Sequence, residues 1–266
     1  MNKLFVAIFI FQFFFIGCTP IKKNNSSKSY KDIVNESHDN EDVRRRLKAI
    51  NELGSKSLYP AILSCLAVVA NVDDQIKFLQ YLLTYFVKHS VIGNKESTVL
   101  ERVVYGVAQE LRRTGNVEDS LTKLIAASPS DQEFKDQFAK TTVRRVASAR
   151  WVLKELEHYK RLTGEVGVET PSRVHVEHIY PQTPPADRRW DSHEKHIGRL
   201  GNLTLLGRKL NISLQNADFV TKKIKYEESD LLLTKELLEY DEWSPQTIED
   251  RQMALSEAAV EIWKYQ

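Results

Sequence analysis

The chain has 266 residues, of which 42% are hydrophobic and 28% charged, so it lies in the ordinary range of globular proteins that bury a core. Its 38 basic and 36 acidic residues give a net charge of only +2, which does not indicate a nucleic-acid binder as a whole. Cys18 and Cys65 are the only cysteines in the sequence, and this excludes a disulfide framework and a CxxC zinc site.

The amino terminus is predicted to be a leader rather than part of a core. A charged start is followed by the apolar run 4–16, which is short for a bilayer span of about 20 residues but has the length of a signal-peptide core. The next residues complete the series Phe-Ile-Gly-Cys, which resembles a lipobox. We therefore expect residues 1–18 to direct export and Cys18 to be lipidated and anchored in a membrane. An uncleaved amphipathic start is the alternative.

The polar segment 19–40, rich in Ser and Asn, is predicted to be a flexible tether. Residues 41–164 are then predicted to form six or seven helices, because apolar residues recur at helical spacing and no segment alternates like a strand. Ser130 and Glu133 have the spacing of a capping box at a helix start. Cys65 lies in an apolar run and is interpreted as a small buried hydrophobic residue.

Short strands are predicted after residue 164. Residues 173–180 are rich in β-branched side chains and end before Pro181, and a second short apolar run covers residues 203–206. Helices are expected over residues 219–226, 231–239 and 245–264. The predicted fold class is therefore α+β and mostly α, in which residues 165–266 form a small ββα-metal, HNH-like nuclease unit with C-terminal helices.

The polar residues of this second region have the order that a ββα-metal finger requires. Glu177 and His178 end the first strand, Asn202 precedes the second, and Asn211 follows it. Hydrolysis of a phosphodiester needs a base for the attacking water and a divalent metal for the developing charge. Imidazole titrates near neutrality, and carboxylate and amide oxygens suit a hard ion. The pattern therefore indicates phosphodiester hydrolysis.

Residues 41–266 resemble the C-terminal part of the GmrSD-type modification-dependent restriction endonucleases, in which a helical region precedes an HNH (His-Me finger) nuclease. The resemblance rests on an ordered series of positions rather than on a single pair: residues 176–183 (Val-Glu-His-Ile-Tyr-Pro-Gln-Thr), Trp190, residues 200–206 (Leu-Gly-Asn-Leu-Thr-Leu-Leu), Asn211, Asn216, Phe219, Lys222, Tyr226, Ser229, Trp243, Arg251 and Trp263.

This resemblance implies a role for each polar residue. His178 would be the general base, Glu177 and Asn211 would hold Mg²⁺ or Mn²⁺, and Asn202 would hydrogen-bond the loop that holds the histidine. Neighbours on a regular strand point to opposite faces, so Glu177 and His178 share a site only if the strand bends or ends there. Asn211 as a helix cap is the alternative to its metal role. A structural zinc ion held by histidines is a further alternative, with four candidates: His175, His178, His193 and His196.

Local charge favours a polyanion near these residues. Residues 173–226 hold ten basic and five acidic side chains, whereas residues 227–266 hold three basic and eleven acidic ones. Basic side chains position a nucleic acid through its phosphates without reading its sequence. The candidates are Arg188, Arg189, Arg208, Lys209, Lys222, Lys223 and Lys225, and a solvated charged face is the alternative for each. Trp190, Trp243 and Trp263 are interpreted as packing residues, and the alternative is that they stack on nucleobases, above all Trp190.

The sequence thus predicts a metal-dependent endonuclease acting on DNA; the alternative is a non-catalytic lipoprotein that binds a partner and retains a nuclease scaffold. The leader predicts an exported, membrane-anchored protein, with a cytoplasmic protein as the alternative. GmrSD-type enzymes carry a nucleotide-hydrolysing domain, and this sequence contains no GxxxxGK[ST] phosphate loop. We therefore expect cleavage to need a divalent metal but no nucleotide, unless a separate partner chain supplies that domain.

Overall fold

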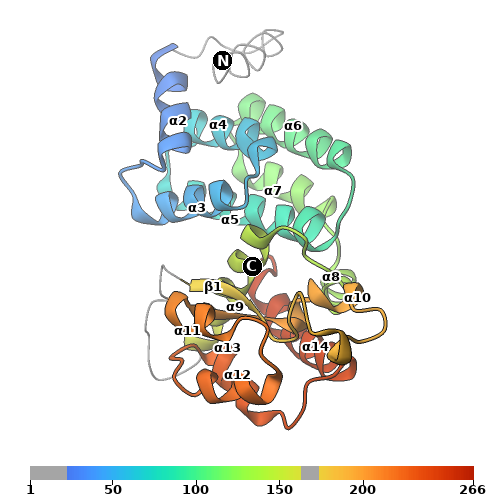
Figure 1. Ribbon diagram of the computed structural model, residues 1–266. Coiled ribbons are helices and arrows are strands. Elements are labelled where there is room, and N and C mark those ends of the chain that lie inside the picture. The colour runs from blue at the N-terminus through green and yellow to red at the C-terminus, as the bar shows by residue number, and fades with distance from the viewer. Residues whose placement is uncertain (1–22, 163–173) are drawn as a thin grey trace. The chain divides into compact units, whose positions relative to one another are not determined.

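The structure is a computed structural model that describes residues 23–162 and 174–266, with the side chains of residues 23–27 and 162 left out (Figure 1). It is mostly helical, with one two-stranded antiparallel sheet, which confirms the predicted α+β, mostly α class. The chain divides into two compact units. Of the described residues, the first contains 23–90, 94–128 and Tyr265; the second contains 91–93, 129–162, 174–264 and Gln266.

The first unit is helical throughout its described part. Its α-helices are α2 (Lys23–Asn35), α3 (Glu41–Glu52), α4 (Tyr59–Val68), α5 (Val72–Phe86), α6 (Ser97–Thr114) and α7 (Val117–Ala126). A short 3₁₀ helix, η1 (Lys56–Leu58), precedes α4, and a π-helix, η2 (Val87–Ile92), follows α5. Asn40, Asn71 and Asn116 cap the helices that they precede, because each amide oxygen accepts a backbone N–H of the first turn.

The second unit contains the sheet and the remaining helices. Its elements are α8 (Asp131–Phe138), α9 (Val146–Leu162), β1 (Val174–His178), η3 (Ala186–Arg188), α10 (Glu194–Ile197), η4 (Leu200–Asn202), β2 (Leu203–Gly207), α11 (Arg208–Leu214), α12 (Phe219–Tyr226), α13 (Leu232–Lys235), η5 (Glu236–Glu239) and α14 (Pro245–Ile262). The predicted strands, the helix at residues 219–226 and the capping box of Ser130 and Glu133 are confirmed.

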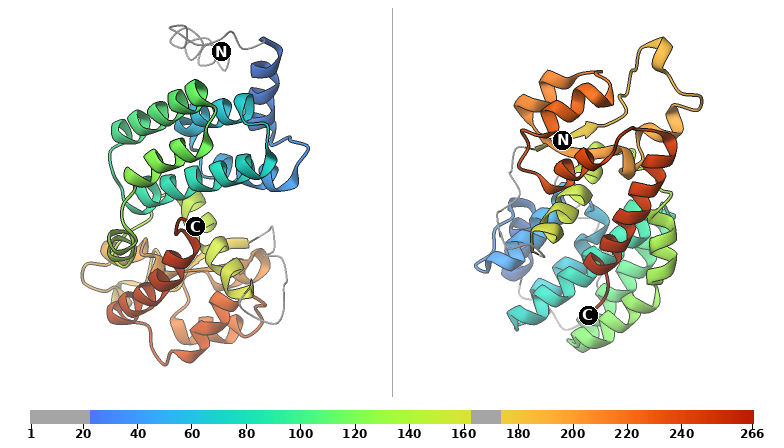
Figure 2. Two further views of the ribbon diagram at one scale, coloured as in Figure 1. Left: turned by 180° about the vertical axis from the view of Figure 1, so that it is seen from behind. Right: turned by 90° about the horizontal axis from the view of Figure 1, so that it is seen from below.

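The long helix α14 supports the second unit from behind the sheet (Figure 2). It packs against α8, α9 and η4. Near its end Trp263 is buried and contacts the rings of Phe134 and Trp151, each with centroids 6.0 Å apart. At η4 the contact is so close that a Cβ on Gly201 would overlap the backbone of Ile248. Position 201, before β2, therefore requires glycine, because α14, which lies far along the chain, packs directly against it.

Two boundaries differ from the sequence predictions. The segment 19–40, predicted to be a flexible tether, contains α2, where Ile33 is fully buried and its carbonyl accepts a hydrogen bond of 2.8 Å from the Asn51 amide. The second compact unit begins at residue 129 rather than 165, because α8 and α9 pack with α14 and the sheet. Both boundaries depend on which side chains are buried together in one core. The composition of a segment does not show this.

The predicted leader 1–18 and its Cys18 lie outside the described residues. Among residues 23–162 and 174–266, no helix has the length and apolar content that a bilayer crossing requires. Cys65 is buried in α4, and burial raises the pKa of its thiol, in agreement with the interpretation of a buried hydrophobic residue.

Candidate active site

The elements β1, β2 and α11 form a ββα unit. The strands pair in antiparallel register from Val174 opposite Gly207 to His178 opposite Leu203. Helix α11 begins directly after β2 and packs against both strands. His178 is therefore the last residue of the first strand, and Asn211 lies in the middle of the helix that covers the pair, half-buried.

The His178 imidazole is free to accept a proton. The ring is half-buried, and within the described part of the chain its nitrogens make no hydrogen bond. Burial lowers the pKa of His178 to about 4, because desolvation disfavours the charged ring, and the nearby Lys222 ammonium lowers it further. The imidazole is consequently neutral near pH 7, which is the form that a general base requires.

Glu177 points to the other face of the strand, as the alternation of side chains demands. It is 6% exposed, and its Oε1 lies 2.6 Å from the Nζ of Lys222, whose side chain is fully buried. Burial raises the pKa of Glu177 and lowers that of Lys222, and each charge opposes the shift of the other. The two groups thus form an enclosed ion pair between β1 and α12.

Lys222 also holds the backbone at the candidate base. Its Nζ donates a hydrogen bond to the carbonyl oxygen of His178, in addition to its pairing with Glu177. The prediction that Lys222 contacts phosphate is therefore wrong, because its ammonium is enclosed and already engaged. The spacing gave a usable signal: Lys222 stands between Phe219 and Tyr226 at helical intervals, on the buried face of α12.

Asn202 fixes the segment that follows His178. Its side chain is fully buried, and Oδ1 accepts from the Tyr180 N–H at 2.7 Å and from Trp243 Nε1 at 3.0 Å. Its Nδ2 donates to the carbonyls of Tyr180 at 3.0 Å and Ile197 at 3.3 Å. Every hydrogen-bonding position of the amide is used, so the chain two residues beyond His178 has one defined path.

Replacing Asn202 by Ala should destabilise the second unit by about 2–4 kcal/mol, because the Tyr180 amide and the Trp243 indole would stay buried without partners. All four tryptophans of the chain, Trp151, Trp190, Trp243 and Trp263, lie in this unit, so urea unfolding followed by tryptophan fluorescence reports on it alone. Asn216→Ala, at an exposed position of the same unit, is the matched control. Equal midpoints for the two variants would contradict the role of Asn202.

Two residues of α14 complete this support, and sequence reasoning gave them no role. Arg251 is buried and donates to the carbonyls of Gly201 and Leu203, each at 2.8 Å. Gln252 is also buried; its Oε1 accepts from the Gly201 N–H at 3.2 Å. The start of β2 is therefore held from behind by α14. A buried arginine that donates to backbone carbonyls is not distinguishable in sequence from one on the surface.

Comparison with protein families agrees with this geometry. The family model of the GmrSD restriction endonucleases, C-terminal domain, matches residues 128–258. This segment belongs to that family. No curated protein matches the chain. The match begins where the second compact unit begins, so the GmrSD C-terminal domain includes α8 and α9 as well as the ββα unit.

The basic residues of the GmrSD C-terminal domain divide by their partners. Arg208 and Lys209 are exposed at the start of α11 and make no ion pair or hydrogen bond within the described chain. Arg188 pairs with Asp218 at 2.9 Å, and Arg189 lies 3.8 Å from Glu194. Lys223 donates to the Tyr240 carbonyl at 2.7 Å, and Lys225 pairs with Glu228 at 2.7 Å. Arg208 and Lys209 are thus the basic side chains best placed to meet a phosphate.

The zinc alternative does not fit this domain. The ring nitrogens of His193 lie 3.2 Å from the Tyr180 hydroxyl and 3.0 Å from the Gln182 carbonyl, so both are engaged inside the protein. Across residues 23–162 and 174–266, no three His, Cys, Asp or Glu side chains are grouped as a metal site would require. Trp243 and Trp263 are buried, as expected for packing residues, and Trp190 stacks on Tyr180 with centroids 3.7 Å apart.

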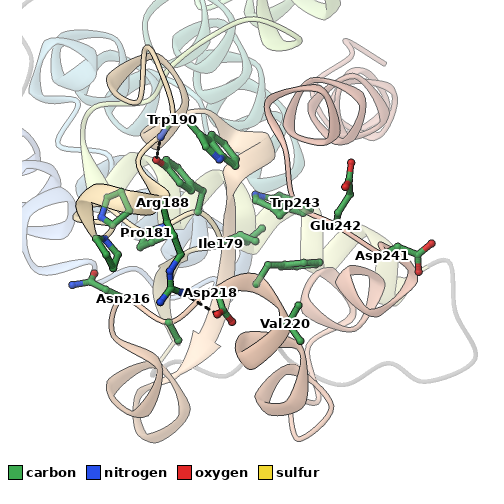
Figure 3. A pocket seen from close by; sticks show the side chains of 15 residues that line it. Ile179, Pro181, Arg188, Trp190, Asn216, Asp218, Val220, Asp241, Glu242 and Trp243 are labelled. Atoms are coloured by element: carbon green, nitrogen blue, oxygen red, sulfur yellow. Dashed lines mark hydrogen bonds and ion pairs between the residues drawn. The ribbon is translucent and has the colours of Figure 1, made fainter.

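A pocket of about 260 Å³ is lined by residues that follow His178 in the sequence (Figure 3). It begins at Ile179, the residue after His178, and its walls come from three segments within residues 179–190, 216–220 and 241–243. Ile179 lies at the middle of the pocket, with Pro181 and Arg188 on one side and Trp243 and Glu242 on the other. The side chains that follow the candidate base in sequence therefore form a surface on which a substrate can rest.

Proposed function

We propose that residues 129–264 form an HNH-type endonuclease that hydrolyses phosphodiester bonds in DNA with the help of a divalent metal. The family supports a nuclease domain related to restriction endonucleases. The observation that carries the proposal is the place of His178: the end of β1 in a ββα unit, with ring nitrogens that make no hydrogen bond among the described residues.

His178 and the residues that position it account for the proton transfer. The neutral imidazole of His178 takes a proton from the water that attacks phosphorus, and becomes imidazolium. Lys222 and Asn202 fix the backbone that follows the imidazole, through the His178 carbonyl and the Tyr180 amide. This rigid placement limits the positions from which the water can attack. Arg208 and Lys209 would hold the flanking phosphates.

The available oxygen ligands suit a hard ion such as Mg²⁺ or Mn²⁺. The Asn211 side chain makes no hydrogen bond within the described residues, so its amide oxygen is uncommitted. The Glu177 carboxylate, by contrast, is enclosed with Lys222 on the other face of β1, which does not fit the metal role predicted for it. We propose that Asn211 helps to hold the ion. When bound, it would stabilise the charge that develops on the phosphate and the leaving oxygen.

Asn211→Ala should raise the metal concentration needed for half-maximal cleavage by about 10- to 100-fold, the range seen when a side chain that supports a metal site is removed. Cleavage of plasmid DNA is measured over a titration of Mn²⁺, with thermal unfolding recorded in parallel. Ser213→Ala, at an exposed position of the same helix, is the control. An unchanged metal requirement together with a lower melting temperature would assign Asn211 to capping or packing of α11 instead.

A further inference from the structure

The pocket that begins at Ile179, here called the Ile179 pocket, is small. Its volume of about 260 Å³ falls below the roughly 300–1,000 Å³ of pockets that take drug-sized ligands. It is too small for a stretch of nucleic acid, and the proposed function requires the sugar-phosphate chain to lie at His178. What enters the pocket must therefore be one flat group attached to that chain.

The walls present flat apolar surfaces. On one side Tyr180 and Trp190 stack with parallel rings, and on the other Phe219 and Trp243 lie with centroids 5.1 Å apart. Trp243 is held by its hydrogen bond to Asn202, so this wall is rigid. Aromatic faces of this kind bind the π-face of an unstacked nucleobase.

The edge of the pocket carries negative charge. Arg188 is already paired with Asp218, whereas Asp241 and Glu242 are exposed and, in the described chain, make no ion pair or hydrogen bond. Both residues belong to the pocket's lining, at its outer rim, where their carboxylates point away from Ile179 (Figure 3). A phosphate is repelled from such an edge, while the N–H donors of an exocyclic amino group are attracted, as when Asp or Glu accepts from cytosine N4.

We propose that the Ile179 pocket binds one nucleobase bearing an exocyclic amino group, next to the phosphodiester that lies at His178. The inference rests on the proposed nuclease function. Ile179 and Tyr180 follow His178 directly, and Asn202 fixes the path of this segment. The distance between the pocket and His178 is therefore constant. A nucleobase bound in the pocket is no longer stacked on its neighbours in the DNA. Single-stranded or distorted DNA is therefore the better substrate.

The first test removes single bases. Oligonucleotides with one abasic position at each site around the cleaved bond are cut by the full chain, and kcat/KM is measured for each. Removal of the base at one position next to the cut should lower kcat/KM about tenfold or more. Replacement of that base by thymine, which has no exocyclic amino group, should have a similar effect. Equal rates for all positions would overturn the proposal.

The second test assigns the effect to the pocket. The double variant Asp241→Ala, Glu242→Ala, which removes both acceptors, should lose the discrimination against thymine at that position. The matched control, Glu227→Ala with Asp230→Ala, removes two exposed carboxylates of the same unit outside the pocket and should keep it. Discrimination that survives in the first variant, or that disappears in both variants, would overturn the proposal.

Binding measured with the same oligonucleotides, by fluorescence anisotropy without metal, separates this inference from the nuclease proposal. If no oligonucleotide is cut but binding still depends on one amino-bearing base through Asp241 and Glu242, the pocket assignment holds and the catalytic one fails. If DNA is cut at rates and bound with affinities that no single base changes, the pocket assignment fails and the catalytic one holds.

Discussion

His178→Ala is expected to lower the rate of metal-dependent DNA cleavage by about 100- to 10,000-fold, the usual contribution of a general base. The structure supports this because the imidazole is neutral, half-buried and not engaged by other described residues. It does not fill a core, so the variant should keep the melting temperature of the native chain within a few degrees. The rate is measured under single-turnover conditions at saturating Mn²⁺.

His175→Ala is the matched control for this variant. His175 lies on the same strand, is also half-buried and pairs with Leu206 in the register of the sheet. It should cut DNA at the native rate. A folded His178→Ala protein that cuts as fast as the His175→Ala protein would remove His178 from the reaction.

Lys222→Met should destabilise the second unit by about 3–5 kcal/mol, because it leaves the Glu177 carboxylate buried without its partner. The double variant Lys222→Met, Glu177→Gln should recover most of this loss, since the buried charge is removed together with its partner. Urea unfolding followed by tryptophan fluorescence measures both.

Lys225→Met is the control on the same helix, where an exposed lysine pairs with an exposed glutamate. It should change stability by less than about 0.5 kcal/mol. If Lys222→Met were as stable as Lys225→Met, Lys222 would not be the enclosed partner of Glu177 that the structure describes.

Local sequence patterns predicted much of the second unit. The strands at 173–180 and 203–206 correspond to β1 and β2, and the helix at 219–226 to α12. These elements are readable because β-branched runs, helical spacing and Pro or Gly breaks act over a few residues. The assignment of Glu177, His178, Asn202 and Asn211 stays a prediction from the resemblance, to which the structure adds their surroundings.

The rest depended on contacts between distant positions. The partners of Asn202 include Trp243, 41 residues away, and those of Gly201 include Gln252, 51 residues away. Lys222 stands among Lys223 and Lys225, so it was grouped with a basic surface although it lies on the buried face of α12. A count of charges treats Lys222, Lys223 and Lys225 alike, whereas their positions on the helix place only Lys222 on the buried face.

The central claim is that this GmrSD C-terminal domain is a working metal-dependent nuclease with His178 as its base. Supercoiled plasmid DNA is incubated with the purified native chain in Mg²⁺, in Mn²⁺ and in EDTA, alongside His178→Ala under the same conditions. We expect nicked or linear DNA only from the native chain and only with metal. Intact plasmid in both metals, or equal cutting by His178→Ala, would contradict it.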